Sequence, residues 1–370
     1  MSPIKIVLDN IIYTKEKQGG ISNYWYEISS ALLQDKTMEP FFVDERDAEL
    51  NCCRQRLKIP EQLQLNPQQH RTPFLARLSS VDIPIPGPLI YHSSFYRPPA
   101  NKKNITEVVT VHDFTHNYYS PWHKRWVHNK LKYGAIERAA GIICVSENTR
   151  NDLHKFCNVK NKEIAVIYNG VSDSYFVKSE LNREEKQFLN QLNLGNTKFL
   201  LFVGSRAGYK NFGFVLDLLQ ELQDYKLVAV GSPFNENEIK ALKIRNLLNR
   251  TINTNNIENS RLNILYNEAH CLVYPSWYEG FGIPVAEAMK AGCPVIALNR
   301  SSIPEIASGG AILMDDLNIT EFKNEVKRLE SEDYRNEIKA RSIIQGRRFD
   351  WIDCTRKTID FYKQVYSRVL

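Results

Sequence analysis

The chain lacks any apolar run long enough to cross a membrane. No segment approaches the roughly 18 consecutive apolar residues of a spanning helix, and the start, Met1-Ser2-Pro3-Ile4-Lys5, has no apolar stretch like that of a secretory signal. The seven cysteines are odd in number and scattered, without zinc-like spacing or a disulfide framework. These absences predict a cytosolic chain with reduced thiols.

An Asp-x-Asp sequence is also absent, and no histidine or carboxylate cluster has the spacing of a metal site. We therefore expect neither a metal ion nor a cofactor. The net charge of +6 is too mild to indicate nucleic acid by itself, although it suits an anionic membrane surface or a phosphorylated substrate.

Length and composition indicate a two-domain globular protein. A chain of 370 residues exceeds what one hydrophobic core usually serves. Its content of 43% hydrophobic and 24% charged residues is ordinary for such proteins.

Short apolar segments alternate with helical patterns along the first half, which predicts a parallel α/β sheet. The expected strands are 4–8, 89–92, 108–112 and 141–145, and the expected helices begin near Ile21, Trp126 and Ser146. Gly19 and Gly20 precede the first helix, for which Ser22 is the expected N-cap. These glycines would let a phosphate or sugar approach the backbone. A tight turn without a ligand is the alternative.

The same alternation restarts after a polar stretch, 173–196, in which we place a linker near residue 175. Strands are expected at 198–203, 226–230, 271–274 and 294–298, with helices at 211–222 and 236–248 and a final helix at 354–369. Two doubly wound Rossmann-like α/β domains result, 1–175 and 176–350. Residues 351–370 are expected to form a helix that returns to the first domain.

The most informative segment is Glu279-Gly280-Phe281-Gly282-Ile283-Pro284-Val285-Ala286-Glu287. An apolar strand runs into it, and the proline suits the first turn of a helix, where its missing N–H is no loss. Glu279 is therefore expected on a loop and Glu287 about one turn into the helix. Glycines beside a carboxylate favour a ligand site, whereas a solvated helix face is the alternative.

Two basic residues follow the strand expected at 198–203. Arg206 and Lys210 lie four positions apart in a glycine-containing loop. A guanidinium fork and an ammonium group together suit a diphosphate. An unrelated pair of surface cations is the alternative.

These segments resemble the retaining glycosyltransferases of family 4, which have the GT-B fold of two Rossmann-like domains facing a cleft. The Glu-x7-Glu element from Glu279 to Glu287 carries most of the resemblance. The other matching segments are Gly19-Gly20-Ile21, Val111-His112-Asp113, Tyr168-Asn169-Gly170-Val171, Ser302-Ile303-Pro304-Glu305 and Phe349-Asp350-Trp351. Arg206 and Lys210 match the family's phosphate-binding pair.

The resemblance implies that the second domain holds a nucleotide sugar. Glu287 would accept hydrogen bonds from the ribose, and Glu279 would bind hydroxyls of the donor sugar. Arg206 and Lys210 would neutralise the diphosphate as its bond to the sugar breaks. The backbone of Phe281, Gly282 and Ile283 would also contact the donor.

From the first domain, the resemblance implies that His112 would contact the transferred sugar and that Gly20 would let a loop close over the phosphates. A histidine satisfied within the core is the alternative for His112.

The similarity to bacterial mannosyltransferase-like members implies transfer of mannose from GDP-mannose with retention. The base is expected to contact residues 250–256, which depart from the family pattern. A UDP-sugar or deoxyhexose donor remains open. So do two other classes, a sugar-nucleotide epimerase of related fold and a non-catalytic nucleotide-sugar-binding partner.

Aromatic and basic residues alternate along residues 118–133, which include Trp122, Lys124, Arg125 and Trp126. Such mixtures suit the interface of an anionic membrane. They are also found in nucleic-acid-binding segments and in solvated basic helices. With the family resemblance, the favoured acceptor is a lipid-linked saccharide on the inner membrane face, as in O-antigen or capsule assembly, with no nucleic acid involved.

Overall fold

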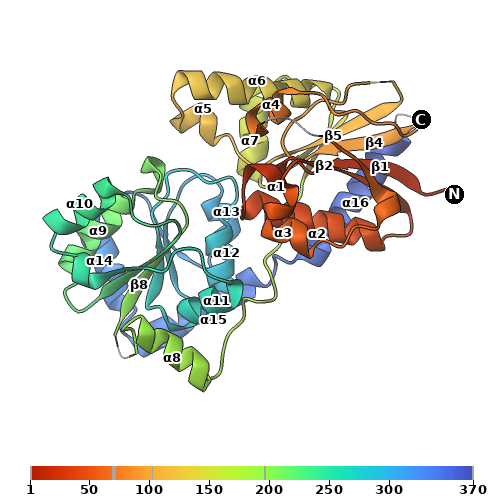
Figure 1. Cartoon of the computed structure of the whole chain (residues 1–370). Coiled ribbons are helices and arrows are strands. Elements are labelled where there is room, and N and C mark those ends of the chain that lie inside the picture. The colour runs from red at the N-terminus through yellow and green to blue at the C-terminus, as the bar shows by residue number, and fades with distance from the viewer. Residues whose placement is uncertain (1, 69–71, 102, 196, 369–370) are drawn as a thin grey trace. The chain divides into compact units, whose positions relative to one another are not determined.

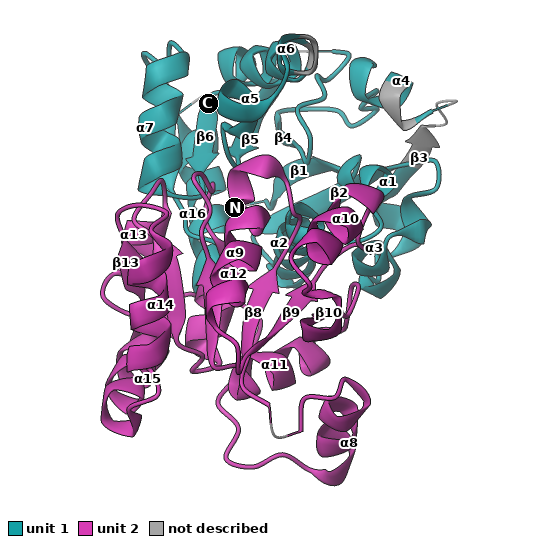
Figure 2. Cartoon of the chain, turned by 90° about the vertical axis from the view of Figure 1, so that its left-hand side faces the viewer, with its two compact units in different colours: residues 1–170, 351–370 teal, residues 171–350 magenta. Residues whose placement is uncertain are grey.

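Two parallel β-sheets organise the chain, one in each of two units. The structure is a computed structural model that describes residues 2–68, 72–101, 103–195 and 197–368. Unit 1 comprises residues 1–170 and 351–370, and unit 2 comprises residues 171–350 (Figure 2). The predicted α/β class with two Rossmann-like sheets is confirmed.

Unit 1 contains a seven-stranded parallel sheet in the order β3-β2-β1-β4-β5-β6-β7 (Figure 1). Its strands are β1 Ile4–Asp9, β2 Met38–Glu45, β3 Gln64–Gln68, β4 Leu89–Ser93, β5 Ile105–Val111, β6 Gly141–Cys144 and β7 Glu163–Val166. Its α-helices are α1 Ile12–Lys15, α2 Gly20–Gln34, α3 Cys52–Arg56, α4 Pro73–Leu78, α5 Thr115–Tyr119, α6 Trp122–Arg138, α7 Glu147–Phe156 and α16 Trp351–Ser367.

Helices cover both faces of this sheet, which explains the uninterrupted apolar strands of the first half. Figure 1 shows α2 and α16 together on one face and α6 on the other. The last helix packs closely on the sheet at Gly141, where an added Cβ would lie 2.7 Å from Val365 Cγ2. The strand β2 was not predicted, because its apolar run is only Phe41 to Val43, with Glu39 and Pro40 before it and Asp44 and Glu45 after it.

The prediction that Ser22 is the N-cap of the helix after Gly19 and Gly20 is wrong. Helix α2 begins at Gly20 with Gly19 as N-cap, and Ser22 lies buried in its first turn. The Ser22 amide and hydroxyl both donate to Glu16 Oε1, at 3.0 and 2.7 Å. A carboxylate from the preceding loop thus satisfies the first turn, and it comes so close to Gly19 that a Cβ there would clash with it.

Unit 2 contains a six-stranded parallel sheet in the order β10-β9-β8-β11-β12-β13. Its strands are β8 Phe199–Val203, β9 Lys226–Val230, β10 Thr251–Asn253, β11 Cys271–Tyr274, β12 Val295–Leu298 and β13 Ile312–Met314. Its α-helices are α8 Arg183–Gln191, α9 Phe212–Glu221, α10 Glu236–Ile244, α11 Asn259–Glu268, α12 Ile283–Lys290, α13 Ile303–Ala307, α14 Ile319–Arg328 and α15 Glu332–Gly346. The polar stretch 173–196 thus contains a helix, α8, which an Asn182–Glu185 capping box begins.

Each sheet has a point at which the strand order reverses. In unit 1 this point lies between β1 and β4, and in unit 2 it lies between β8 and β11. Parallel sheets of this kind bind ligands beyond the carboxyl ends of the strands at such a point. Among the described helices, none has both the length and the apolar composition that crossing a bilayer requires.

Candidate functional site

The candidate site of unit 2 is formed by the loops that follow β8 and β11, the two strands at its reversal point. Lys210 ends the short helical turn after β8, and Glu279 lies on the loop between β11 and α12. Lys210 Nζ lies 2.9 Å from Glu279 Oε1, and both side chains are largely buried, with 11% and 13% of their surfaces exposed. The structure therefore brings these two predicted site residues into direct contact.

Hydrogen bonds to backbone carbonyl oxygens join the two loops on which this pair lies. Asn211 Nδ2 donates to the carbonyl oxygen of Pro275 at 2.7 Å, and the Trp277 amide donates to the carbonyl oxygen of Tyr209 at 2.9 Å. Asn211 has a left-handed backbone with φ of 53°, which asparagine tolerates better than most residues. The ammonium–carboxylate pair is thus held by its backbone as well as by its charges.

Two serines from the loop after β12 fix the Glu279 loop from the other side. The Glu279 amide donates to Ser301 Oγ at 2.8 Å. The hydroxyl of the fully buried Ser302 donates to the carbonyl oxygens of Glu279 and Phe281, each at 3.0 Å. Such anchoring limits the movement of the loop before a ligand arrives.

Helix α12 begins as the sequence predicts. Gly282 is its N-cap with φ of 94°, a conformation that favours glycine, and a Cβ there would lie 2.6 Å from Ile303 Cδ1. Pro284 occupies the first turn. The Phe281 ring is buried against Phe349, with centroids 5.4 Å apart, so only the backbone of this residue is placed to contact a ligand.

Glu287 lies one turn into α12 beside two tyrosines. The Tyr266 hydroxyl donates to Glu287 Oε2 at 3.1 Å, and Tyr175 also forms a hydrogen bond with this carboxylate. Burial raises the pKa of Glu287 to about 7, although the two tyrosines lower it. Among the residues that the structure describes, no cationic side chain pairs with this buried carboxylate. Its burial is therefore costly, and its position favours a ligand that donates hydrogen bonds.

Arg206 and Lys210 pair with different carboxylates. The Nε of Arg206 lies 2.8 Å from Glu238 Oε1, and its Nη2 donates to the carbonyl oxygens of Ser232 and Pro233. Its Nη1 is buried and has no hydrogen-bond partner among the described residues. Two edges of the guanidinium are thus anchored by groups that follow β9, and one nitrogen remains for a ligand.

We expect Glu238→Gln to weaken binding of a nucleoside diphosphate about 3- to 10-fold, because a charge-assisted hydrogen bond that orients Arg206 is lost. Isothermal titration calorimetry measures the change, and Glu236→Gln on the exposed face of the same helix is the matched control. Tighter binding in Glu238→Gln would instead show that Glu238 competes with the ligand for Arg206.

The segment predicted to contact the base, 250–256, lies next to the loop after β9 whose carbonyl oxygens accept hydrogen bonds from Arg206. Asn253 Nδ2 donates to the carbonyl oxygens of Ala229 and Ser232, each at 3.2 Å. Arg250 itself donates to the carbonyl oxygens of Tyr225 and Leu219. Its guanidinium is therefore used within the fold.

The remaining predicted site residues, His112 and Gly20, belong to unit 1. His112 directly follows β5, and its ring meets the edge of Tyr24 with centroids 5.1 Å apart. Burial lowers its pKa to about 4, so the imidazole is neutral at physiological pH. Gly20 is the exposed first residue of α2.

Sequence reasoning missed the roles of Tyr175, Glu238 and Tyr266. Tyr175 falls in the segment assigned to the linker. Glu238 forms a capping box with Asn235, and this local role masks its second contact with Arg206. No local pattern gives these contacts, because each joins residues more than 20 positions apart.

Two family models match most of the chain. The model described as Glycosyltransferase Family 4 matches residues 18–175, and the model described as Glycosyl transferases group 1 matches residues 183–348. The chain is similar to the O-antigen chain mannosyltransferase B of Escherichia coli, with 27% identity over 287 residues that cover 74% of each chain. It is also 27% identical to the O-antigen chain mannosyltransferase RfbU of Salmonella typhimurium over 60% of this chain and 61% of that protein.

Solved structures show the same fold. The structure of Anabaena HepE in complex with UDP-glucose aligns with a TM-score of 0.72 and 16% identity over 98% of this chain and 100% of that one.

Proposed function

The chain belongs to glycosyltransferase family 4 and has the GT-B fold, and from this premise we propose that it transfers a hexose, with retention, onto a lipid-linked saccharide in the assembly of a surface polysaccharide. The proposed donor is GDP-mannose, bound by unit 2, and unit 1 binds the acceptor. The names of the two O-antigen mannosyltransferases to which the chain is similar support the choice of mannose.

One observation carries this proposal, namely the contact of Lys210 with Glu279 at the reversal point of unit 2, with Glu287 one turn further along. In the proposed complex, Lys210 and the anchored Arg206 face the donor diphosphate. Glu279 accepts hydrogen bonds from the sugar, and Glu287 accepts them from the ribose. The family resemblance also implies roles for two residues of unit 1, namely His112 toward the transferred sugar and Gly20 toward the phosphates.

The proposed reaction breaks the bond between the anomeric carbon and the diphosphate oxygen and forms a bond to the acceptor oxygen on the same face. The departing phosphate takes the proton of the acceptor hydroxyl. Negative charge grows on the diphosphate as its bond breaks, so Lys210 stabilises the transition state more than the ground state. Glu279 is already paired with this ammonium, which suits it for binding hydroxyls better than for attacking the sugar.

We expect this transfer to proceed without a divalent cation, because Lys210 and Arg206 provide the positive charge that the diphosphate requires. Activity measured in 5 mM EDTA should match activity measured in 5 mM Mg²⁺ within about two-fold, far less than the roughly 10²- to 10³-fold loss expected when an essential charge is removed. A large loss in EDTA that Mg²⁺ restores would contradict this expectation.

Unit 1 carries a surface that suits the proposed location on the inner membrane face. The side chains of Trp122 and Trp126 on α6 are 75% and 63% exposed, and Arg125 and Lys130 lie beside them. Indole rings sit at headgroup level, and cations meet anionic lipid.

We expect Trp122→Ser/Trp126→Ser to weaken binding to vesicles of anionic phosphatidylglycerol about ten-fold or more, because two interfacial anchors are removed. Sedimentation with vesicles measures the change. The control is Ile344→Ser/Ile352→Ser, which removes two side chains that are equally exposed, 71% and 78%, on other helices. Equal weakening in both variants would contradict a membrane role for α6.

A thermal-shift panel of GDP, UDP and dTDP with their sugars tests the proposed donor, since a specific ligand stabilises the fold according to its affinity. We expect GDP-mannose to give the largest increase in Tm. A larger increase with a UDP- or dTDP-sugar would change the proposed donor but not the proposed transferase activity.

Two other outcomes would change the proposed activity. Conversion of the donor to an epimer without any acceptor would indicate an epimerase. Binding of the donor without turnover on any acceptor would indicate a non-catalytic partner.

A further inference from the structure

Two cations lie against one aromatic ring in unit 1. Lys15 Nζ, from α1, lies 3.1 Å from the centroid of the Phe95 ring, and Arg77 Cζ, from α4, lies 4.6 Å from it. An aromatic face attracts a cation. Two cations on the same ring also repel each other, and this arrangement is costly unless a third group neutralises them.

Two histidines extend the same cluster. His116 of α5 stacks on His128 of α6, with ring centroids 3.9 Å apart. The ring of His128 in turn lies 5.7 Å from Phe95 and 5.9 Å from Tyr96. One turn further along α6, Lys132 Nζ donates to the carbonyl oxygen of Asp113 at 2.7 Å. We call Lys15, Arg77, His116, His128 and Lys132 the cationic cluster.

Direct ion pairs are lacking in the cationic cluster as far as the structure describes the chain. Within the described ranges, no carboxylate forms an ion pair with any of its members, and Arg77 Nε is buried without a hydrogen-bond partner. The charges of nearby carboxylates still act on the cluster without direct pairing: Glu16 acts on Lys15, and Asp113 acts on His116 and Lys132. Both carboxylates also accept hydrogen bonds elsewhere, Asp113 Oδ1 from the Thr115 amide and Glu16 Oε1 from Ser22.

The pKa values of two cluster residues are lowered, in part because positive charges lie close together. Desolvation of the ammonium group is the main cause that lowers the pKa of Lys15 to about 7, although the residue as a whole is exposed. Arg77 lowers this pKa further, and Glu16 opposes the shift. Burial also lowers the pKa of His128 to about 2, with added repulsion from Lys132, His116, Arg77 and Lys15. His128 is therefore neutral at physiological pH, and Lys15 is only partly protonated. An arriving anion would favour the charged form of Lys15 and could pair with both Lys15 and Arg77.

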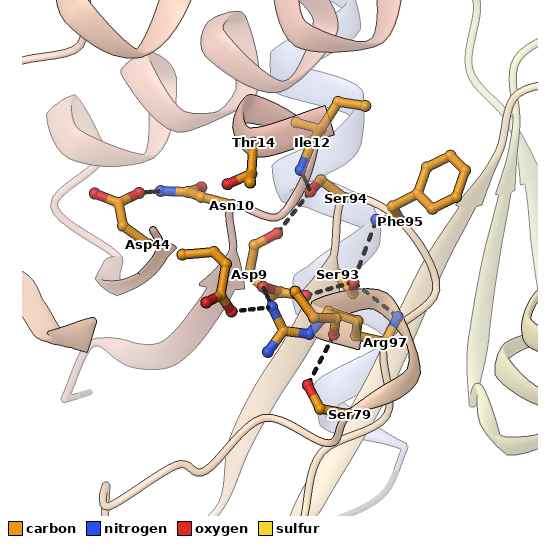
Figure 3. Close-up of polar contacts among 12 residues, drawn as sticks. Asp9, Asn10, Ile12, Thr14, Asp44, Ser79, Ser93, Ser94, Phe95 and Arg97 are labelled. Atoms are coloured by element: carbon orange, nitrogen blue, oxygen red, sulfur yellow. Dashed lines mark hydrogen bonds and ion pairs between the residues drawn. The ribbon is translucent and has the colours of Figure 1, made fainter. Parts of the chain in front are cut away.

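A buried polar network holds the Phe95 ring in place (Figure 3). Ser93 Oγ donates to Asp9 Oδ2 at 2.8 Å and accepts from the amides of Phe95 and Arg97. The Arg97 guanidinium, which is fully buried, lies between Asp9 and Glu45, at 3.4 and 3.2 Å. The loop after β4 is thus fixed to the end of β1.

The same network fixes the helix that carries Lys15. Ser94 Oγ donates to the carbonyl oxygen of Asp9 at 2.7 Å and accepts from the Ile12 amide at 3.0 Å, at the start of α1 (Figure 3). The next loop residue, Tyr96, has a left-handed backbone with φ of 65°, which a bulky residue adopts only when its surroundings impose it. A rigid loop of this kind is suited to hold side chains for a ligand.

The cationic cluster lies near the reversal point of the unit 1 sheet, since Phe95 follows β4 and Lys15 follows β1, the two strands on either side of it. We propose that the cationic cluster binds the diphosphate of a phosphorylated acceptor, an inference that rests on the proposed function. A guanidinium fork with an ammonium group suits phosphate oxygens. The donor diphosphate already has Lys210 and Arg206 in unit 2, which leaves this second set of cations for the acceptor.

Matched acceptors test the proposal in the full chain. One is a saccharide linked to polyprenyl diphosphate, and the other is the uncharged octyl glycoside of the same saccharide. We expect Lys15→Gln/Arg77→Gln to lower kcat/KM for the diphosphate acceptor at least ten-fold. For the octyl glycoside, kcat/KM should stay within two-fold of the wild-type value. The control is Lys36→Gln/Lys160→Gln, which removes two exposed lysines of unit 1 elsewhere. Equal loss with both acceptors, or no loss with either, would overturn the proposal.

Binding of inorganic pyrophosphate separates this proposal from the proposed function, because it needs no turnover. We expect wild type to bind pyrophosphate with a component that Lys15→Gln/Arg77→Gln loses and Lys210→Ala keeps, as measured by calorimetry. This result would support diphosphate binding by the cationic cluster even if no acceptor were glycosylated. Unchanged pyrophosphate binding in the double variant would overturn this binding role even if transfer were observed. The Tm of the double variant should equal or exceed that of wild type, because repulsion is relieved.

Discussion

Lys210→Ala is expected to lower kcat about 10²- to 10³-fold while donor affinity changes by less than about ten-fold. The ammonium group lies at the reversal point of unit 2, where the diphosphate of the donor would gain negative charge during bond breaking. An interaction that strengthens only in the transition state affects turnover more than binding. Single-turnover rates and calorimetric donor affinity separate the two quantities.

The control for Lys210→Ala is Lys240→Ala, which removes an exposed ammonium group from α10 in the same unit. Because Lys210→Ala leaves Glu279 partly buried without its cation, Lys210→Gln is a second variant that keeps a hydrogen-bond donor. Parallel losses of kcat and donor affinity in both Lys210 variants would show that Lys210 only binds the donor.

Glu287→Gln is expected to stabilise the free protein and to impair donor binding. The pKa of Glu287 is raised from 4.5 to about 7 by burial, so the native state disfavours its carboxylate. Below about pH 4.5 the group is protonated in both states. As the pH rises to about 7 the unfolded chain loses its proton first, and the native state loses roughly 3 kcal/mol of stability that does not return at higher pH.

Urea denaturation at pH 5 and pH 8 measures this effect. At pH 8 we expect Glu287→Gln to raise the free energy of unfolding by about 3 kcal/mol, and at pH 5 by less than about 1 kcal/mol. Donor affinity should fall, because an amide accepts fewer hydrogen bonds from the ribose than a carboxylate does. The exposed Glu268→Gln on α11 serves as control. Lower stability at pH 8 together with unchanged donor affinity would make Glu287 a structural residue.

The pH dependence of wild-type donor binding follows from the same group. The Glu287 carboxylate, which we propose accepts the ribose hydroxyls, forms as the pH rises through about 7. Donor affinity should therefore increase between pH 6 and pH 8. Glu287→Gln should lack this increase. The measurement thus links one side chain to both the stability and the binding of the protein.

The local pattern around Glu287 was enough to predict the strand, loop and helix that carry it. The apolar residues 271–274 match β11, and Pro284 marks the first turn of α12. Such signals are local, because they depend on periodicity and on the missing N–H of proline. The strand β2 gave no such signal, since a proline and three acidic side chains flank its short apolar run.

Contacts between distant segments could not be predicted. The orientation of Arg206 depends on Glu238, 32 positions away, and the raised pKa of Glu287 depends on its burial beside Tyr175 and Tyr266. We predicted that Arg206 and Lys210 act together on a diphosphate because they lie four residues apart. In the structure, Arg206 pairs with Glu238, after β9, and Lys210 pairs with Glu279.

The most direct test of the account is the transfer reaction itself. Wild-type protein is incubated with GDP-mannose and a polyprenyl-diphosphate-linked saccharide, and NMR of the product gives the anomeric configuration. The account predicts an α-mannosylated saccharide formed with retention, and a rate at least 100-fold lower in Lys210→Ala, about the loss expected for an essential charge. A product of inverted configuration, or a Lys210→Ala variant as active as wild type, would contradict it.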